Sequence, residues 1–335
     1  MASKAAVAVL GAGSFGTALA IQLARRGSPT LLWGRDAARM QAMQASRENA
    51  QYLPGCAFPV KLTAIFDLEA AVSGAEDVLI ATPSHALRET LHTIKPWLRD
   101  RQGIACASKG FEPGTGRLVH EVIADELSDE TPVAVISGPT FAKELGLGLP
   151  TAVTVASTNP SFAEIIAGQL HGDGFRAYTA DDIVGVEVGG AVKNVMAIAV
   201  GIADGLGLGS NTRAMLITRG LAEIIRLGEA LGAQSETLIG LAGMGDLVLT
   251  CTDNQSRNRR MGLLLADGRT VEQAIAEISQ VVEGVRAAPE ALRLARKLKV
   301  DMPITEAVCG VLEGKLKPVE AVSLLARRPA KAEAD

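Results

Sequence analysis

Lys193 occupies a position where a lysine could act as an acid or a base. It follows Gly189 and Gly190 by about one helical turn, and residues three or four apart lie on one helix face. Glycine inside a helix costs roughly 1 kcal/mol relative to alanine, so two in succession require a reason. We predict that they leave a gap beside Lys193 for a small substrate or the reactive ring of a cofactor. Close helix packing, with Lys193 reaching to water, is the alternative.

A second cation and an acid have similar glycine-rich neighbours. Lys109 lies between Ser108 and Gly110, and Asp246 follows a glycine-rich turn. Burial and a nearby cation both lower the pKa of a lysine towards neutrality. Such a lysine can protonate a ketone oxygen as hydride arrives, and remove the proton in the reverse direction. We predict Lys193, Lys109 and Asp246 as catalytic. The alternatives are an exposed loop lysine for Lys109 and a helix N-cap for Asp246.

Three consecutive hydrogen-bond donors, Ser256, Arg257 and Asn258, precede the helix-like run Met261–Ala266. A helix start and an arginine bind phosphate well. The net charge of the whole chain is −4, so an anionic ligand needs such a local positive field. The cluster predicts a phosphorylated small-molecule substrate, whereas a plain basic helix surface is the alternative.

The chain begins with the elements of a dinucleotide site. The apolar run Ala5–Leu10 leads into Gly11, Gly13 and Gly16, spaced as GxGxxG, and the helical pattern Thr17–Arg26 follows. In this setting the first glycine permits a tight turn, the second lets the backbone approach a pyrophosphate, and the third lets the helix pack on the strand. The pyrophosphate would lie at the positive end of that helix. We predict a nicotinamide dinucleotide here, with packing alone as the alternative.

The choice between NAD and NADP stays open. Arg35 and Asp36 follow the second expected strand, where an acid holds the ribose 2′-hydroxyl of NAD and an arginine accommodates the 2′-phosphate of NADP. Because both types are present, NADP or NAD is the prediction. A pair of solvated turn charges is the alternative.

Apolar runs of strand length alternate with helical patterns through the first half and predict an α/β fold, a Rossmann-type doubly wound parallel sheet. After about Asp181 only helical patterns remain, so an all-α C-terminal domain should follow. We expect a dinucleotide-binding domain over residues 1–180, an all-helical substrate-binding domain over 181–327, and a disordered tail over 328–335. The expected strands are Ala5–Leu10, Thr30–Trp33, Asp77–Ala81, Ile104–Ala107, Val133–Ile136 and Ala152–Val155.

Composition narrows the possible partners. The net charge disfavours nucleic-acid binding. The four cysteines, Cys56, Cys106, Cys251 and Cys309, are far apart, so we expect no metal site, and a reducing cytoplasm fits best. Residues 183–209 are very apolar, yet Glu187, Lys193 and Asp204 interrupt them, which predicts a buried helix and no integral membrane association.

Taken in order, these clusters resemble the bacterial NAD(P)-dependent glycerol-3-phosphate dehydrogenases, over nearly the whole chain. Most clusters are modest alone, but their order over this length is specific. The segments that carry the resemblance are Gly11–Gly16, Ser108–Gly110, Gly138–Glu144, Glu187–Asn194, Gly240–Asp246, Ser256–Asn258 and Val281–Gly284.

The resemblance implies that Lys193 donates or accepts the proton and that dihydroxyacetone phosphate is reduced to sn-glycerol 3-phosphate for phospholipid synthesis. A homodimer is the usual state of soluble enzymes of this kind. The implied substrate contacts are Lys109, Gly138, Thr140, Lys193, Asp246, Ser256, Arg257 and Asn258. The implied cofactor contacts, beside the three glycines, are Ser14, Phe15, Arg35, Lys109, Ala142, Arg257, Val281 and Glu283.

Two rival functions fit parts of the pattern. A dehydrogenase of other small hydroxy or keto acids would share the first half and a helix-borne lysine, but it would not need the donors at 256–258. A redox sensor that binds the dinucleotide without chemistry would leave the glycines beside Lys193 unexplained.

Overall fold

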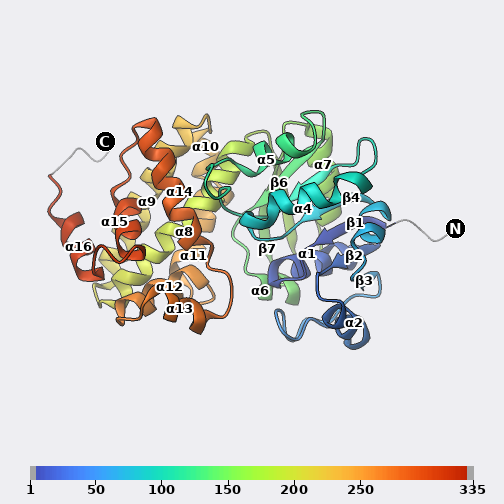
Figure 1. The fold of residues 1–335 in the computed structure, drawn as a ribbon, viewed down its shortest axis with the longest axis horizontal. Helices are drawn as coiled ribbons and strands as arrows, with labels where there is room; N and C mark the ends of the chain where they lie inside the picture. The colour runs from blue at the N-terminus through green and yellow to red at the C-terminus, as the bar shows by residue number, and fades with distance from the viewer. Residues whose placement is uncertain (1–4, 330–335) are drawn as a thin grey trace.

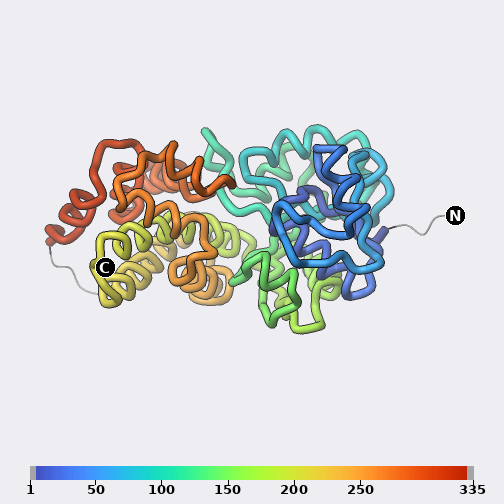
Figure 2. The backbone as a smooth tube through the Cα atoms, turned by 90° about the horizontal axis from the view of Figure 1, so that it is seen from below, coloured from blue at the N-terminus to red at the C-terminus, as the bar shows by residue number. Residues whose placement is uncertain are grey.

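The computed structural model describes residues 5–329, in which one β-sheet with helices on both faces is followed by an array of helices. The two halves lie side by side along the long axis of the molecule (Figures 1 and 2). The predicted fold class, a Rossmann-type sheet followed by an all-helical region, is confirmed. The strands are β1 (Ala5–Leu10), β2 (Thr30–Trp33), β3 (Leu62–Ile65), β4 (Ala75–Ile80), β5 (Ile104–Cys106), β6 (Val133–Ser137), β7 (Thr151–Ala156) and β8 (Phe175–Ala180).

The sheet has eight strands in the order β3-β2-β1-β4-β5-β6-β7-β8. Its first six strands are parallel and reverse their order between β1 and β4, as in dinucleotide-binding folds. The carboxyl ends of β1, β4, β5 and β6 therefore meet at one edge of the sheet. This edge receives the glycine-rich turn and the loop that carries Lys109.

The sheet departs from the predicted parallel arrangement at one pair of strands, because β7 runs antiparallel to β6. Helix α6 (Ala142–Leu147), between these strands, has six residues. It spans about 9 Å, whereas a parallel return over the five residues of β6 needs about 16 Å. The chain therefore turns back at Gly148, whose φ is +80°. As a result, β7 begins beside the carboxyl end of β6 and runs in the opposite direction.

All six predicted strands are present, with bounds that differ by at most two residues, but two further strands were not predicted. These are β3 and β8, the two edge strands. In β8, Arg176 and Tyr178 point to solvent, so the apolar pattern that marks a buried strand is absent. Edge strands are buried less completely, and their sequences consequently carry a weaker signal.

Helices cover both faces of the sheet with separate apolar cores. Side chains of α1, α2, α6 and α7 fill the core on one face, and those of α3, α4 and α5 fill the other. These helices are α1 (Ser14–Arg25), α2 (Ala37–Ser46), α3 (Leu68–Ser73), α4 (Leu87–Ile94), α5 (Val119–Glu126), α6 (Ala142–Leu147) and α7 (Pro160–Leu170).

Helix α8 (Ile183–Gly205) is the centre of the helical half, and α9, α11, α12, α14 and α15 pack around it. It is long and apolar enough to cross a membrane, but 94% of its most apolar window is buried inside the protein. This confirms the predicted buried, glycine-rich helix. The other helices are α9 (Gly209–Ala230), α10 (Ser235–Leu238), α11 (Asp246–Thr252), α12 (Arg257–Ala266), α13 (Val271–Ile278), α14 (Glu283–Leu298), α15 (Pro303–Leu312) and α16 (Pro318–Ala326).

The end of the chain is described only in part. In the expected tail, Arg328 forms an ion pair with Asp301, with Nη2 2.6 Å from Oδ2. Residues 330–335 of that tail lie outside the described residues, as do residues 1–4.

Candidate active site

Lys193 lies in the middle of α8 and is only 6% exposed. Its ammonium group donates to a carboxylate oxygen of Asp246 and to Thr250 Oγ1, the latter at 2.8 Å. Asp246 and Thr250 lie one turn apart on α11, and the Thr250 hydroxyl donates to the Asp246 carbonyl oxygen at 2.6 Å. The alternative in which Lys193 reaches to water is therefore wrong.

The two glycines before Lys193 do not leave an empty gap, contrary to the prediction. A Cβ on Gly189 would lie 2.7 Å from the carbonyl oxygen of Ala242, and one on Gly190 would lie 2.8 Å from Ser137 Oγ. Ala242 belongs to the turn of π-helix over Leu241–Gly245 that leads into α11. The missing side chains let this turn and the end of β6 approach α8, and that approach sets Asp246 against Lys193.

Lys109 follows β5 and reaches the same carboxylate. Its Nζ lies 2.6 Å from Asp246 Oδ2 and 3.4 Å from the carbonyl oxygen of Gly138, which follows β6. It also lies 5.7 Å from the centre of the Phe15 ring on α1. The structure thus gathers Lys109, Lys193, Asp246, Gly138 and Phe15 at the junction of the sheet and the helical half, and Lys109 is not an exposed loop lysine.

Charge and burial shift the pKa values of Lys193 and Asp246. Burial, the largest effect, and the Lys109 cation lower the pKa of Lys193, whereas Asp246 raises it; the net result is a pKa of about 8. Burial disfavours the ionised Asp246 carboxyl, but Lys109 and Lys193 outweigh it and hold its pKa below the ordinary value. Asp246 therefore stays ionised, while Lys193 can exist in both protonation states near neutral pH.

Ser256, Arg257 and Asn258 lie at the start of α12, as predicted. The Ser256 hydroxyl caps this helix by accepting from Arg259 N at 3.1 Å. Asn258 Nδ2 donates to Asn194 Oδ1 at 2.8 Å, and Asn194 is the neighbour of Lys193 in α8. The cluster is therefore fixed to the residue next to Lys193, and Arg257 contributes a half-buried positive charge there.

The glycine-rich turn has the geometry that a dinucleotide requires. Gly11 has a φ of +123°, and a Cβ there would lie 2.7 Å from the carbonyl oxygen of Ala81. A Cβ on Gly16 would lie 2.0 Å from the carbonyl oxygen of Gly11, whereas one on Gly13 would meet nothing within 4 Å. Gly11 and Gly16 are thus needed for packing, and Gly13 faces open space above the start of α1. A pyrophosphate fits over Gly13 and Ser14.

Two buried hydroxyls at the same edge of the sheet also indicate a ligand site. Thr82 Oγ1, after β4, and Ser137 Oγ, at the end of β6, have no hydrogen-bond partner among the described residues. A buried hydroxyl without a partner is costly. Both stand at the sheet edge where cofactors bind in such folds, so they are suited to hydrogen-bond a ligand there.

Arg35 and Asp36 are both exposed after β2. Asp36 is the N-cap of α2 and its Oδ1 accepts from Arg39 N at 3.0 Å. One carboxylate oxygen is thus used in capping a helix, whereas Arg35 is available to a ligand. The structure leaves the choice between NAD and NADP open.

The remaining implied cofactor residues stand at the junction. Glu283, the first residue of α14, accepts from Ser84 Oγ at 3.2 Å, which joins the helical half to the loop after β4. Burial raises the pKa of Glu283, against the effects of Ser84 and Arg257. Ala142 and Val281 are half-buried.

Thr140 is also half-buried, and its Oγ1 lies 3.4 Å from that of Thr151. It follows β6 two residues after Gly138, so the sheet carries it to the same edge.

The sequence reasoning missed two functional neighbours. Thr250 bonds Lys193, and its position four residues after Asp246 on one helix is a signal that could have identified it. Ser84 bonds Glu283, but the two residues are far apart in the sequence and no local pattern connects them.

Comparison with known proteins connects this geometry to one family. Residues 6–163 match the family model for the NAD-dependent glycerol-3-phosphate dehydrogenase N-terminus, and residues 182–323 match the model for the C-terminus. The first model ends within α7, and the second begins at Asp182, directly before α8, where the helical half starts.

Relatives and solved structures agree over the whole chain. A glycerol-3-phosphate dehydrogenase (NAD(P)+) of Stenotrophomonas maltophilia is 54% identical over 327 residues, which are 98% of this chain and 96% of the relative. A crystal structure of glycerol-3-phosphate dehydrogenase from Coxiella burnetii is 49% identical, with a TM-score of 0.93 over 97% of this chain and 99% of that chain. The Saccharomyces cerevisiae glycerol-3-phosphate dehydrogenase structure is 25% identical, with a TM-score of 0.83 over 96% and 99% of the two chains.

Proposed function

This chain belongs to the NAD-dependent glycerol-3-phosphate dehydrogenase family, and on that premise we propose that Lys193, Lys109 and Asp246 form its catalytic centre. It is an NAD(P)-dependent oxidoreductase that interconverts dihydroxyacetone phosphate and sn-glycerol 3-phosphate, the backbone precursor of glycerophospholipids. One observation carries the assignment of these residues. Two ammonium groups share the buried Asp246 carboxylate at the junction of the sheet and the helices.

Lys193 moves the proton in this proposal. When bound, the nicotinamide supplies hydride to the carbonyl carbon of dihydroxyacetone phosphate. The Lys193 ammonium donates its proton to the carbonyl oxygen, where negative charge develops. In the reverse direction the neutral amine removes the hydroxyl proton of sn-glycerol 3-phosphate. Asp246 and Thr250 orient the nitrogen, and Lys109 adds positive charge that favours the developing oxyanion.

Arg257 is the main phosphate ligand, with Ser256 and Asn258 beside it. Its guanidinium can form two charge-assisted hydrogen bonds to one phosphate, and the start of α12 adds a positive dipole. Asn258 also accepts from Gly284 N at 2.9 Å, so the phosphate site is joined to α14. Gly138 and Thr140 border the substrate from the sheet side.

The glycine-rich turn would hold the cofactor. Gly13 and Ser14 would bind its pyrophosphate, and Arg35 its adenosine ribose. The other residues that would contact the cofactor are Phe15, Lys109, Ala142, Arg257, Val281 and Glu283. The support is the open space above Gly13 and the hydroxyls of Thr82 and Ser137, for which residues 5–329 provide no hydrogen-bond partner.

The wider organisation is part of the same proposal. The dinucleotide-binding domain spans residues 1–180 and the substrate-binding domain residues 181–327. The protein acts as a homodimer in the cytoplasm without integral membrane association. The burial of the apolar helix α8 supports the last point, because such a helix is used here as a core element.

Oxidation of NADH and of NADPH, each measured with dihydroxyacetone phosphate and with dihydroxyacetone, tests the function. We expect turnover with the phosphorylated ketone and with at least one cofactor, and a far higher KM for dihydroxyacetone. Equal activity on both ketones would favour a dehydrogenase of another small ketone. An absence of turnover with both cofactors would favour a sensor.

A further inference from the structure

Residues 110–118, named the strap here, form a loop of the sheet half that packs against the helical half. They lie between β5 and α5 and contain neither helix nor strand. Phe111 and Leu118, at 2% and 4% exposed, belong to the apolar core of the helical half. Among the described residues they are the only members of that core that precede α8. Figure 2 shows the strap, in green-teal, reaching from the sheet towards the orange helices.

Helix α14 contacts the strap along its length. Gly114 N donates to Glu290 Oε1 at 2.6 Å, and a Cβ on Gly116 would lie 3.2 Å from Leu294 Cγ. At its beginning, Gly110 has a φ of +139°, and a Cβ there would lie 2.8 Å from Ser84 Oγ. The strap is thus held where the two halves meet, and it begins directly after Lys109.

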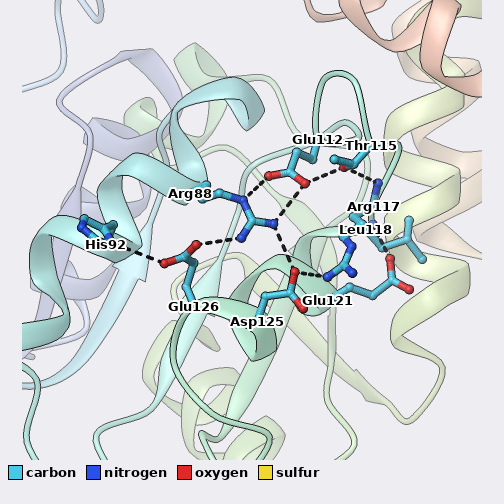
Figure 3. A network of polar contacts seen from close by, with 9 residues as sticks. All are labelled: Arg88, His92, Glu112, Thr115, Arg117, Leu118, Glu121, Asp125 and Glu126. Atoms are coloured by element: carbon cyan, nitrogen blue, oxygen red, sulfur yellow. Dashed lines mark hydrogen bonds and ion pairs between the residues drawn. The ribbon is translucent and has the colours of Figure 1, made fainter.

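Arg88, on α4, binds the strap through Glu112 (Figure 3). Its Nε lies 2.5 Å from Glu112 Oε1, and its Nη2 lies 3.1 Å from Glu112 Oε2. The same guanidinium binds Glu126 Oε1 at 2.7 Å and Asp125 Oδ2 at 3.2 Å, both at the end of α5. Arg88 therefore joins α4, α5 and the strap, and Glu112 is the strap residue that it binds.

The ion pair between Arg88 and Glu112 borders a cavity on the outer side of the strap. Glu112 and Pro113 line a cavity of about 570 Å³ together with His85, Arg88 and Arg286. The Glu112 side chain is only 11% exposed, and the hydrogen bond from Arg88 holds its pKa below the ordinary value. A bidentate contact with a carboxylate of low exposure fixes geometry better than an exposed pair does.

We propose that Arg88 is a positioning residue of the reaction, which fixes the strap through Glu112 and thereby places the Lys109 ammonium beside Asp246. The inference rests on the proposed function, because it assumes that Lys109 serves the reaction. Glu112 lies three residues after Lys109, and Glu112 N donates to the carbonyl oxygen of Arg117 at 2.9 Å. This bond closes the strap on itself, so a displacement of Glu112 moves the whole loop.

Two carboxylates that bind the same guanidinium provide a matched comparison. Glu112→Gln weakens the contact on the strap, and Glu126→Gln weakens a contact on α5. A misplaced catalytic group lowers the rate, so we expect kcat/KM to fall about tenfold or more in Glu112→Gln. We expect a change within about twofold in Glu126→Gln, as for most surface ion pairs. The Tm should fall by similar amounts in both variants.

Addition of Lys109→Met separates positioning from a loss of folding. Glu112→Gln should lower kcat/KM no further in a protein that already carries Lys109→Met, because it acts through that lysine. Equal losses in Glu112→Gln and Glu126→Gln, or an additive loss in the double variant, would overturn the proposal.

A readout without turnover keeps this test independent of the proposed function. The acylation rate of Lys109 by an N-hydroxysuccinimide ester, followed by peptide mass spectrometry, reports how firmly Lys109 is held at Asp246. We expect faster labelling in Glu112→Gln than in wild type or Glu126→Gln. An unchanged rate would overturn the positioning proposal, whereas absent turnover in the wild type would overturn the function alone.

Discussion

The two ends of the active site are built in different ways. At the nucleotide end, three glycines within six residues shape the backbone, and a pyrophosphate fits over the one that faces open space. At the catalytic end, Lys193 and Asp246 are 53 residues apart in sequence, and Lys109 and Asp246 are 137 apart, yet they form one buried cluster. The first site is a local property of the chain, whereas the second exists only after the two halves have packed together.

Because the two ends are built separately, a substitution at one end should leave the function of the other unchanged. Lys193→Met should give the largest effect, a fall in kcat. Removal of a general acid lowers kcat by about 100- to 10,000-fold. Cofactor affinity, read from fluorescence quenching on titration with NADH or NADPH, should stay near the wild-type value. Lys143→Met, at an exposed lysine of α6, is the control. A normal kcat in Lys193→Met would remove the acid–base role from this residue.

Arg257→Ala should weaken phosphate recognition. The loss of charge-assisted hydrogen bonds raises KM for dihydroxyacetone phosphate by between about 10- and 100-fold. With the cofactor at saturating concentration, the activity on unphosphorylated dihydroxyacetone should change little, because that ketone has no phosphate to bind. Arg269→Ala, at an exposed arginine, is the control. Equal losses on both ketones would mean that Arg257 does not bind the phosphate.

Gly13→Ala should affect only the nucleotide end. A Cβ there meets no protein atom within 4 Å, so the fold and its Tm should be kept. The methyl group would occupy the space of the pyrophosphate and raise the Kd for the cofactor by about tenfold, the equivalent of one or two hydrogen bonds to a charged group. Gly168→Ala, also free of contacts, is the matched control. Unchanged cofactor affinity would move the pyrophosphate away from this turn.

The same difference, between a local site and one that forms by packing, explains which features could be predicted from the sequence. The spacing of Gly11, Gly13 and Gly16 fixed the first strand, the turn and α1, because each glycine acts on its own neighbourhood. The edge strands β3 and β8 and the reversal of β7 depend on burial and on the length of the return path, which a local pattern does not encode.

At the catalytic end, the sequence indicated which residues belong to the site, but it did not indicate how they are arranged. Lys193, Lys109 and Asp246 stood out by their glycine-rich neighbours, and the structure brings them together. The interpretation of Gly189 was wrong because its missing side chain admits the Ala242 backbone, a contact 53 residues away in the sequence. The strap contacts were not predicted either, since Phe111 packs into the core of the helical half and Glu112 bonds Arg88, 24 residues away in the sequence.

We propose that Lys193 is the proton donor and acceptor, with a pKa that burial and Lys109 lower to about 8. The direct test is the pH dependence of kcat for oxidation of sn-glycerol 3-phosphate, which requires the neutral amine. The rate should rise with pH and pass its midpoint near pH 8. In Lys109→Met the neighbouring cation is gone, the pKa of Lys193 rises, and the midpoint should move to higher pH. A midpoint that stays in place or moves to lower pH in Lys109→Met would contradict the account.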